Sequence, residues 1–305
     1  NHTSYQGRLK ENTQLGAELI GLDSIEADAE MLAMVVDGLK QTGLKEFQVN
    51  IGHVDFIQSL LETTGFEEEE MEELRTLITN RNYFGVDEIL DNKNVKGSVK
   101  EAFHTLPELM GGPEILEQAA RLAPNVNARL AITRLQQIYK LLKLYHAEDH
   151  ITFDLSMIGS YGYYSGIIFR AYTYGTGDAV VRGGRYDHLL EKFGKSTPSI
   201  GFAIIVDELM SALNRQKIRV ETSYRNLIVY TQATEEWAVS LAMNFRSKGK
   251  NIEIIKREPE DDRKKYEDYA RNSSIMSMLY LQDNYQIEML NLITGEEKTV
   301  TAKKQ

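Results

Sequence analysis

Residues 157–166, MIGSYGYYSG, contain adjacent tyrosines and no charged side chain. Aromatic residues favour strands, so the stretch predicts a strand that builds an aromatic wall. Tyr163 and Tyr164 could line a pocket and offer hydroxyl groups there, but the stretch has no charged group that could do chemistry. Adjacent strand residues face opposite ways, so we expect only one of these tyrosines to point fully into the pocket.

A second stretch, VVRGGRYD at residues 180–187, combines glycines with polar side chains. Gly183 and Gly184 allow close approach of the backbone. Arg185 can bind a carboxylate or phosphate with two parallel hydrogen bonds, and Tyr186 adds a hydrogen-bonding group. Taken alone, the stretch fits a structural turn as well as it fits a binding site.

Other chemical signals are weaker. His146 and His150 have the spacing that lets two imidazoles share a metal on one helix face, but a polar helix end explains them better. The glycines of YGTGDAVV fit a turn, because no helix follows that could present its N-terminus to a phosphate. The sequence has no Gly-x-Ser-x-Gly, His-Glu-x-x-His or Walker motif, and no cysteine for disulfides, thiolate nucleophiles or zinc. We therefore expect neither a metal nor a cofactor.

Composition predicts a soluble protein with about two domains. The chain has 305 residues, more than a single core usually holds, and its 42% hydrophobic and 26% charged residues are typical of globular proteins. No apolar run approaches the roughly 18 residues of a membrane span, and no signal peptide opens the chain, so we expect a cytoplasmic protein. The net charge of -10 argues mildly against a large nucleic-acid footprint.

Hydrophobic periodicity predicts the elements that position these residues. Helical spacing begins at Ser24 and stops at Gly43, and FQVNI follows as a strand. After a helical block, alternation from Ile151 to Met157 predicts a strand. GIIFRAYTY then reaches AVV through a glycine-containing loop typical of a hairpin, and SIGFAIIV leads into a helix. Strands joined in this way imply a mostly antiparallel sheet.

These patterns divide the chain into four parts with an α+β fold. Residues 1–55 and 147–213 form a core, and residues 56–146 form a helical insertion whose run FEEEEMEEL is a solvated face. Residues 214–225 are a polar linker. Residues 226–305 alternate strands and helices, which predicts a small α/β domain with parallel pairing. From residue 222 onward, 13 Lys and Arg face 13 Asp and Glu, without the basic excess of a strong RNA binder.

Five segments in order resemble the catalytic core of histidyl-tRNA synthetases: GRLKENTQLGAELIG, DAE at 28–30, YYSG at 163–166, GGRYD at 183–187 and PSIGFA at 198–203. RSKGKNIEI and NLITGEEKTV resemble the anticodon-binding domain of the same enzymes. The resemblance covers nearly the whole chain and implies a class II synthetase sheet with a helical insertion between its second and third motifs. It also implies that a preceding segment holds the first motif and much of a dimer interface.

The chain departs from this pattern at two positions. Histidyl-tRNA synthetases carry an Arg-Gly-Leu-Asp-Tyr-Tyr stretch whose arginine stabilises charge as histidine attacks ATP, and that position falls on Gly159. Their third motif provides an ATP-contacting arginine where this chain has Glu208. Loss of one preorganised charge stabiliser lowers a rate roughly 10²- to 10³-fold. We therefore expect no catalytic residues and no useful formation of histidyl-adenylate.

The chain retains more of the residues that form the amino-acid pocket in this family than of those that contact ATP. In the family, Gln-x-Gly-x-Glu receives histidine, and this chain retains Gln14 and Glu18. A carboxylate can pair with an ammonium or an imidazole N–H, and an amide can donate or accept. The resemblance thus predicts histidine binding by four residues, with an outer shell of three more. The four are Gln14, Glu18, Tyr163 and Tyr164, and the shell is Arg8, Arg185 and Tyr186. The alternative for both tyrosines is simple packing in the sheet.

A synthetase-like core with these losses resembles the regulatory subunits of ATP phosphoribosyltransferase, paralogues that lack aminoacylation activity. This resemblance implies a homodimer within a hetero-oligomer with the short-form catalytic subunit, which joins ATP to phosphoribosyl pyrophosphate in the first step of histidine biosynthesis. It implies L-histidine as a candidate effector, bound either in the old pocket or at the subunit interface. Two alternatives stay open: an active histidyl-tRNA synthetase in which Arg170 or Arg182 supplies the missing charge, and a tRNA- or histidine-sensing module of the same fold.

Overall fold

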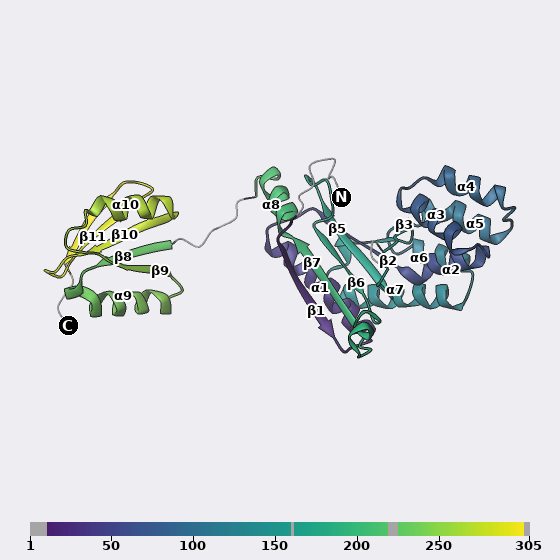
Figure 1. The fold of residues 1–305 in the computed structure, drawn as a ribbon, viewed down its shortest axis with the longest axis horizontal. Coiled ribbons are helices and arrows are strands. Elements are labelled where there is room, and N and C mark those ends of the chain that lie inside the picture. The colour runs from purple at the N-terminus through teal and green to yellow at the C-terminus, as the bar shows by residue number, and fades with distance from the viewer. Residues whose placement is uncertain (1–10, 160–161, 219–224, 302–305) are drawn as a thin grey trace. The chain divides into compact units, whose positions relative to one another are not determined.

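The structure is a computed structural model that describes residues 11–159, 162–218 and 225–301. It divides into two compact units, Asn1–Val220 and Glu221–Gln305 (Figure 1).

The first unit is built on a seven-stranded sheet of order β1-β7-β6-β5-β2-β4-β3. Its strands are β1 (Gln14–Ile20), β2 (Phe47–His53), β3 (Met110–Gly111), β4 (Ile151–Asp154), β5 (Ile167–Thr173), β6 (Val181–Arg185) and β7 (Ser199–Ile205). Neighbouring strands pair antiparallel except β2 and β4, which run parallel. The prediction of a mostly antiparallel sheet is confirmed.

The strand predicted through the tyrosine stretch is wrong. β4 ends at Asp154, and the described residues of 157–166 form turns and irregular backbone. The Asp154 carboxylate accepts hydrogen bonds from the Ser156 amide (3.0 Å) and the Ser156 hydroxyl (2.5 Å). Such a local side-chain bond favours a turn over a continuing ladder. The expectation that the two tyrosines face opposite ways therefore fails with the strand.

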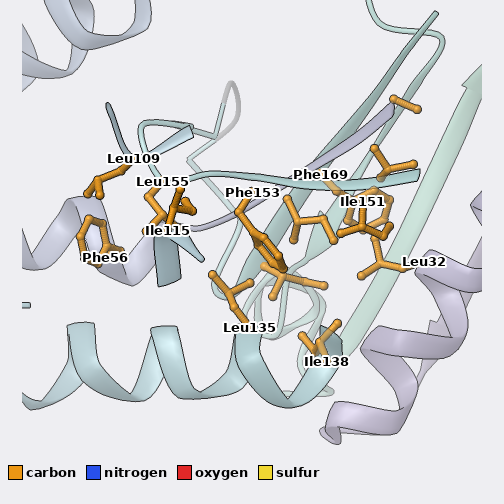
Figure 2. Close-up of a cluster of buried hydrophobic side chains, with 14 of the residues drawn as sticks. Leu32, Phe56, Leu109, Ile115, Leu135, Ile138, Ile151, Phe153, Leu155 and Phe169 are labelled. Atoms are coloured by element: carbon orange, nitrogen blue, oxygen red, sulfur yellow. The ribbon is translucent and has the colours of Figure 1, made fainter. Parts of the chain in front are cut away.

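Two long helices cover one face of the sheet. They are α1 (Ile25–Gln41) and α7 (Val126–Leu144), which pack against each other. The hydroxyl of Ser24 caps α1 by accepting from the Ala27 amide at 3.1 Å. Figure 2 shows the resulting core, a cluster of buried side chains that includes Leu32 of α1, Ile138 of α7 and Phe169 of β5.

Between β2 and β4 the chain is mostly helical. The segments before α7 are α2 (Val54–Thr64), α3 (Glu68–Thr79), α4 (Tyr83–Asn92), α5 (Ser98–Thr105), the short helix η1 (Leu106–Glu108) and α6 (Ile115–Leu122). The acidic run lies at the start of α3, where most of its glutamates are exposed to solvent. On the opposite side of α3, Leu74 and Ile78 are buried in the core. The run is thus the polar side of an amphipathic helix.

Three short helices complete the first unit: η2 (Glu148–His150), η3 (Leu189–Phe193) and α8 (Val206–Arg215). The first two residues of the predicted linker belong to α8. The two histidines near η2 do not share a helix face, because α7 ends at Leu144. His150 instead stacks on Phe47, with ring centroids 4.1 Å apart.

The second unit has a five-stranded sheet of order β12-β11-β10-β8-β9. Its elements are β8 (Arg225–Tyr230), η4 (Gln232–Thr234), α9 (Glu235–Ser247), β9 (Asn251–Lys256), α10 (Arg263–Asn272), β10 (Ile275–Leu281), β11 (Gln286–Asn291) and β12 (Glu297–Thr301). β8 pairs parallel with β9 and β10, but β10, β11 and β12 pair antiparallel. The predicted parallel pairing holds only where a helix connects the strands, since short turns join the others. Helices α9 and α10 pack on opposite faces (Figure 1).

Candidate functional site

A row of small residues crosses the face of the first sheet that α1 and α7 leave uncovered. Glu18 of β1 stands opposite Gly201 of β7, which stands opposite Gly184 of β6. Residues directly opposite one another in a sheet share a face. The two glycines therefore leave a floor beside Glu18 that no side chain of their own fills.

Two of the predicted site residues lie over this floor. A methyl group added to Gly201 would come within 1.5 Å of Oε2 of Glu18, and one added to Gly184 within 2.7 Å of the Tyr164 ring. Glycine permits this close approach. The carboxylate of Glu18 and the ring of Tyr164 thus rest on the sheet surface.

Three tyrosines and Glu18 form one cluster. The ring centroid of Tyr163 lies 4.7 Å from that of Tyr164 and 5.9 Å from that of Tyr186, the latter edge to face. The Tyr186 hydroxyl donates a hydrogen bond to Oε2 of Glu18. Burial raises the pKa of Tyr186 far above its ordinary value, and the bond to Glu18 raises it further. Tyr186 therefore stays protonated and holds the carboxylate in place.

Gln14 lies on the same face of β1 but farther from the tyrosines. It stands opposite Ile205, four residues along the strand from Glu18, and its side-chain amide donates to Oδ1 of Asn12 at 2.9 Å. Gln14 is exposed to solvent. Arg8, the other predicted residue from this segment, lies outside the described residues.

Arg185 lies on the other face of the sheet, toward α1. Its Nε and one terminal nitrogen donate to Oδ1 of Asp28 at 2.9 and 2.6 Å, and the other terminal nitrogen donates to Asp187 at 3.0 Å. Asp28 also accepts from Nε of Arg134 at 2.6 Å. Because Arg185 is 1% exposed and fully engaged, this geometry makes it part of a buried ion network and gives no support to a place in the ligand shell.

The alternation along β6 could have revealed this from the sequence. Residues next to each other in a strand face opposite ways. Arg185 falls between Gly184 and Tyr186, so these neighbours cannot share its face. Tyr186 thus lies on the face of Glu18 and Arg185 on the face of Asp28.

A cavity of about 1350 Å³ opens beside the tyrosines and extends to α2 and α3. Its wall includes Asp55, Glu68, Glu72 and Arg75. Arg75 donates to Glu68 at 2.7 Å and to Glu72 at 3.0 Å. Burial, and then the charge of Glu62, raise the pKa of Asp55. The sequence did not point to this wall, because its members come from helices with an ordinary charged surface.

The two departures from the synthetase pattern fall near this site and on α8. Gly159 lines the cavity and contributes no side chain to it. Glu208 lies in the first turn of α8, where a carboxylate interacts favourably with the helix dipole. Its neighbour Asp207 accepts a hydrogen bond from the amide of Thr13, the residue before β1, at 2.8 Å.

The described ranges contain neither a metal site nor a membrane-spanning helix. Residues 11–159, 162–218 and 225–301 contain no group of three or more His, Cys, Asp or Glu side chains placed to hold a metal ion. The same ranges contain no helix that is both long enough and apolar enough to cross a bilayer.

Residues 1–209 match the family model described as "Histidyl-tRNA synthetase". Three curated relatives are each named "ATP phosphoribosyltransferase regulatory subunit". That of Acetivibrio thermocellus is 36% identical over 97% of this chain and 70% of its own length. Those of Thermoanaerobacter pseudethanolicus and Geobacter metallireducens are 37% and 35% identical, over 81% and 92% of this chain and 66% and 64% of their own lengths. The chain thus spans about two thirds of the length of these relatives.

Solved structures agree with the sequence comparison. A structure from Bacillus halodurans, described as an ATP phosphoribosyltransferase regulatory subunit/histidyl-tRNA synthetase, has a TM-score of 0.71 and 30% identity, and the match covers 90% of this chain and 69% of that one. Histidyl-tRNA synthetase from Nostoc sp. PCC 7120 has a TM-score of 0.73 at 17% identity, over 97% of this chain and 74% of that one. The second match shows the fold alone, that of a histidyl-tRNA synthetase.

Proposed function

The chain belongs to the ATP phosphoribosyltransferase regulatory subunits of the histidyl-tRNA synthetase family, and from this premise we propose that it is a non-catalytic partner that binds histidine. It would assemble with a separate catalytic subunit that joins ATP to phosphoribosyl pyrophosphate. The observation that carries the proposal is the contrast between the intact cluster of Glu18 and Tyr186 and the loss of arginine at Gly159 and Glu208.

The cluster can recognise histidine without chemistry. Glu18 accepts one hydrogen bond from Tyr186 and keeps further lone pairs for an ammonium or imidazole N–H. Tyr163 and Tyr164 present aromatic surface beside it, and an imidazole can pack against such rings. These contacts favour a bound amino acid but supply no charge to a reacting phosphate.

The surroundings also disfavour adenylate formation. Gly159 contributes no cation, and Glu208 reverses the charge that the family places after Gly-Phe-Ala. Losing one such group lowers a rate roughly 10²- to 10³-fold, and a carboxylate near a triphosphate adds repulsion.

Regulation by histidine then requires two states of the assembly. A ligand that binds both states equally shifts neither, however tightly it binds. Histidine must therefore bind one arrangement of the hetero-oligomer more tightly. A cluster of side chains from a loop resting on a sheet suits this role, because a small change in the loop alters the contacts of Tyr163 and Tyr164.

One observation favours the alternative of an active synthetase. A terminal nitrogen of Arg170 donates to the carbonyl oxygen of Ile158 at 3.4 Å, which brings a guanidinium next to Gly159. A cation from β5 thus lies near the position where the family has its arginine. This alternative predicts histidine-dependent exchange between pyrophosphate and ATP at synthetase-like rates.

The test measures that exchange together with histidine binding by calorimetry, using the complete protein. We expect measurable binding, no exchange above background, and activity of the catalytic subunit that depends on adding this protein. Tyr186→Phe should weaken binding roughly tenfold, since it removes the bond that holds Glu18, and Tyr145→Phe, an exposed tyrosine at the end of α7, is the matched control. Exchange at synthetase-like rates would overturn the proposal, as would a catalytic subunit unaffected by this protein.

A further inference from the structure

A second cavity, of about 430 Å³, opens on the side of the first sheet that α1 and α7 cover. Residues of both helices line it, together with His53 at the end of β2. It shares Asp55 and Ser165 with the cavity beside the tyrosines, whereas Glu18 and the three tyrosines of the candidate site do not line it. Its volume lies within the roughly 300–1,000 Å³ of small-molecule sites.

His53 contributes a buried hydrogen-bond donor to this cavity. Its side chain is 5% exposed and lines this cavity but not the one beside the tyrosines. Nδ1 accepts a hydrogen bond from the Asp55 amide at 3.3 Å, so the neutral ring carries its proton on Nε2. That N–H has no acceptor among the described residues. A buried donor without a partner indicates a group from outside the chain that accepts from it.

Arg134 of α7 provides a second donor on the same wall. Its Nε donates to Asp28 at 2.6 Å, and Nη2 donates to Asp23 at 3.1 Å and to the carbonyl oxygen of Ser24 at 3.4 Å. Nη1 makes no hydrogen bond within the described part of the chain. The bonds to Nε and Nη2 fix the planar guanidinium, so they also fix the direction of the Nη1 donors.

The charges around the cavity favour a monoanion beside His53. Burial lowers the pKa of His53, and the positive charges of Arg134 and Arg185 lower it further, so these arginines make the potential at the ring positive. Three carboxylates also line the cavity, those of Asp23, Asp55 and Asp187. Two of them are paired with the arginines, Asp23 with Arg134 at 3.1 Å and Asp187 with Arg185 at 3.0 Å. The carboxylates disfavour a dianion such as phosphate, whose greater charge adds repulsion.

We propose that this cavity is a binding site for a small carboxylate, whose oxygens accept hydrogen bonds from Nε2 of His53 and Nη1 of Arg134. A carboxylate has one charge and two acceptor oxygens, which matches one cation and two donors. The site is distinct from the candidate histidine site, and the inference does not depend on histidine binding. Ser165 follows the two tyrosines in the chain and lines both cavities, so an occupant here contacts the segment that carries them.

The experiment titrates acetate into the complete protein at neutral pH and constant ionic strength, and follows the imidazole nitrogens by NMR. The His53→Asn variant assigns the His53 signal, because it lacks this imidazole. We expect the Nε2 signal to shift and to saturate with a Kd in roughly the millimolar range, as a ligand of few atoms allows. Acetamide, which has a similar shape without the charge, should bind about tenfold more weakly. Phosphate should also bind more weakly, because of its greater charge.

A matched pair of variants on α7 relates the response to this cavity. Gln137→Glu adds a negative charge to its wall and should weaken acetate binding roughly fivefold. Gln136→Glu adds the same charge at a side chain that lines neither cavity, and should change the affinity less than about twofold. Gln137 is exposed to solvent, so its replacement keeps the fold.

Three results would overturn the site. A His53 signal that does not respond to acetate up to roughly 100 mM would mean that the cavity holds water only. Equal affinities for acetate and acetamide, or tighter binding of phosphate, would overturn the assignment to a carboxylate. Equal acetate affinities in Gln137→Glu and Gln136→Glu would place the bound acetate elsewhere on the protein. Histidine binding is measured separately, so each of these results leaves the proposed function standing.

Discussion

The two faces of the first sheet use the same residue types for different purposes, and β6 contains both uses. On the face covered by α1, Arg185 is 1% exposed and bound to Asp28. On the uncovered face, Arg182 is partly exposed and stands opposite another arginine. Arg185 is enclosed with fixed carboxylates, so removing one of them would leave a buried charge unpaired, whereas Arg182 is half-exposed and bonded to Asp178 beside a like charge. The position of an arginine relative to the pleat therefore says more about its role than its motif does.

The largest expected effect comes from breaking the buried network. Asp28→Ala leaves Arg185 and Arg134 without the carboxylate that both contact. Removing one partner of a buried ion pair lowers the free energy of unfolding by about 3–5 kcal/mol. Denaturant unfolding monitored by circular dichroism measures it.

Asp23→Ala is the matched control. Asp23 contacts the same Arg134 at 3.1 Å, but its side chain is 58% exposed. An exposed pair contributes less than about 1 kcal/mol, so this variant should unfold near the unsubstituted protein. Equal losses in the two variants would contradict the distinction between a buried structural face and an open one.

The neighbouring glycines of β6 test the same contrast more finely. A methyl group on Gly183 would lie 2.4 Å from the buried Phe169 ring, whereas one on Gly184 would lie 2.7 Å from the Tyr164 ring. Gly183→Ala should therefore lower the free energy of unfolding by about 1–3 kcal/mol, as overpacking in a core does. Gly184→Ala should act mainly on the tyrosine loop and weaken histidine binding.

Measuring unfolding and histidine affinity on both variants separates the two faces. Each added methyl group also approaches a backbone oxygen within 3 Å, Gly201 O for Gly183 and Ile167 O for Gly184, so both variants share that effect on the sheet. The comparison therefore uses the difference between the two variants in free energy of unfolding and in histidine affinity, from which this shared effect cancels. If Gly184→Ala lost stability and kept affinity, the uncovered face would not be the binding face.

The sequence predicted the scaffold better than the site, for a physical reason. Alternation and hairpin signals are local, so the antiparallel strands such as β5 and β7 were found with their approximate bounds. The tyrosine stretch was misread because the bonds between Asp154 and Ser156 end the strand, and strand propensity does not include such bonds. The pairing of β2 with β4 joins segments about a hundred residues apart, and no local pattern encodes it.

The candidate site, like the fold, could be predicted only in part from local sequence patterns. Glu18 and Tyr186 come from distant segments, and their contact depends on the pairing of β1, β7 and β6, which the motif order suggested only through a family resemblance. The placement of Arg182 opposite Arg170 depends on the register of a hairpin, in which a shift of one residue would move a side chain to the other face. Register comes from the packed fold, so the sequence named these arginines without placing them.

The smallest expected effect is a pH dependence of the covered face, contributed by His53. This side chain is buried at the end of β2, and burial, with the charges of Arg134 and Arg185, lowers its pKa from 6.5 to about 3. Its Nδ1 accepts from the Asp55 amide, which caps α2, and the Asp55 carboxylate lies 3.8 Å away. The neutral imidazole is therefore the form that the fold requires.

The direction of this pH dependence follows from the number of protons that the folded and unfolded states bind. Between about pH 3 and pH 6.5 the unfolded chain binds a proton at His53 that the folded protein does not. The stability that neutral His53 contributes is therefore fully present above pH 6.5 and decreases as the pH falls. From pH 7 to pH 5.5 it should lower the free energy of unfolding by about 1 kcal/mol. His53→Asn keeps a side-chain acceptor for the cap but cannot be protonated, so its unfolding should lose less stability over this range. The same slope in both proteins, measured by denaturant unfolding at each pH, would show that other groups titrate and that His53 does not set the acid sensitivity of this face.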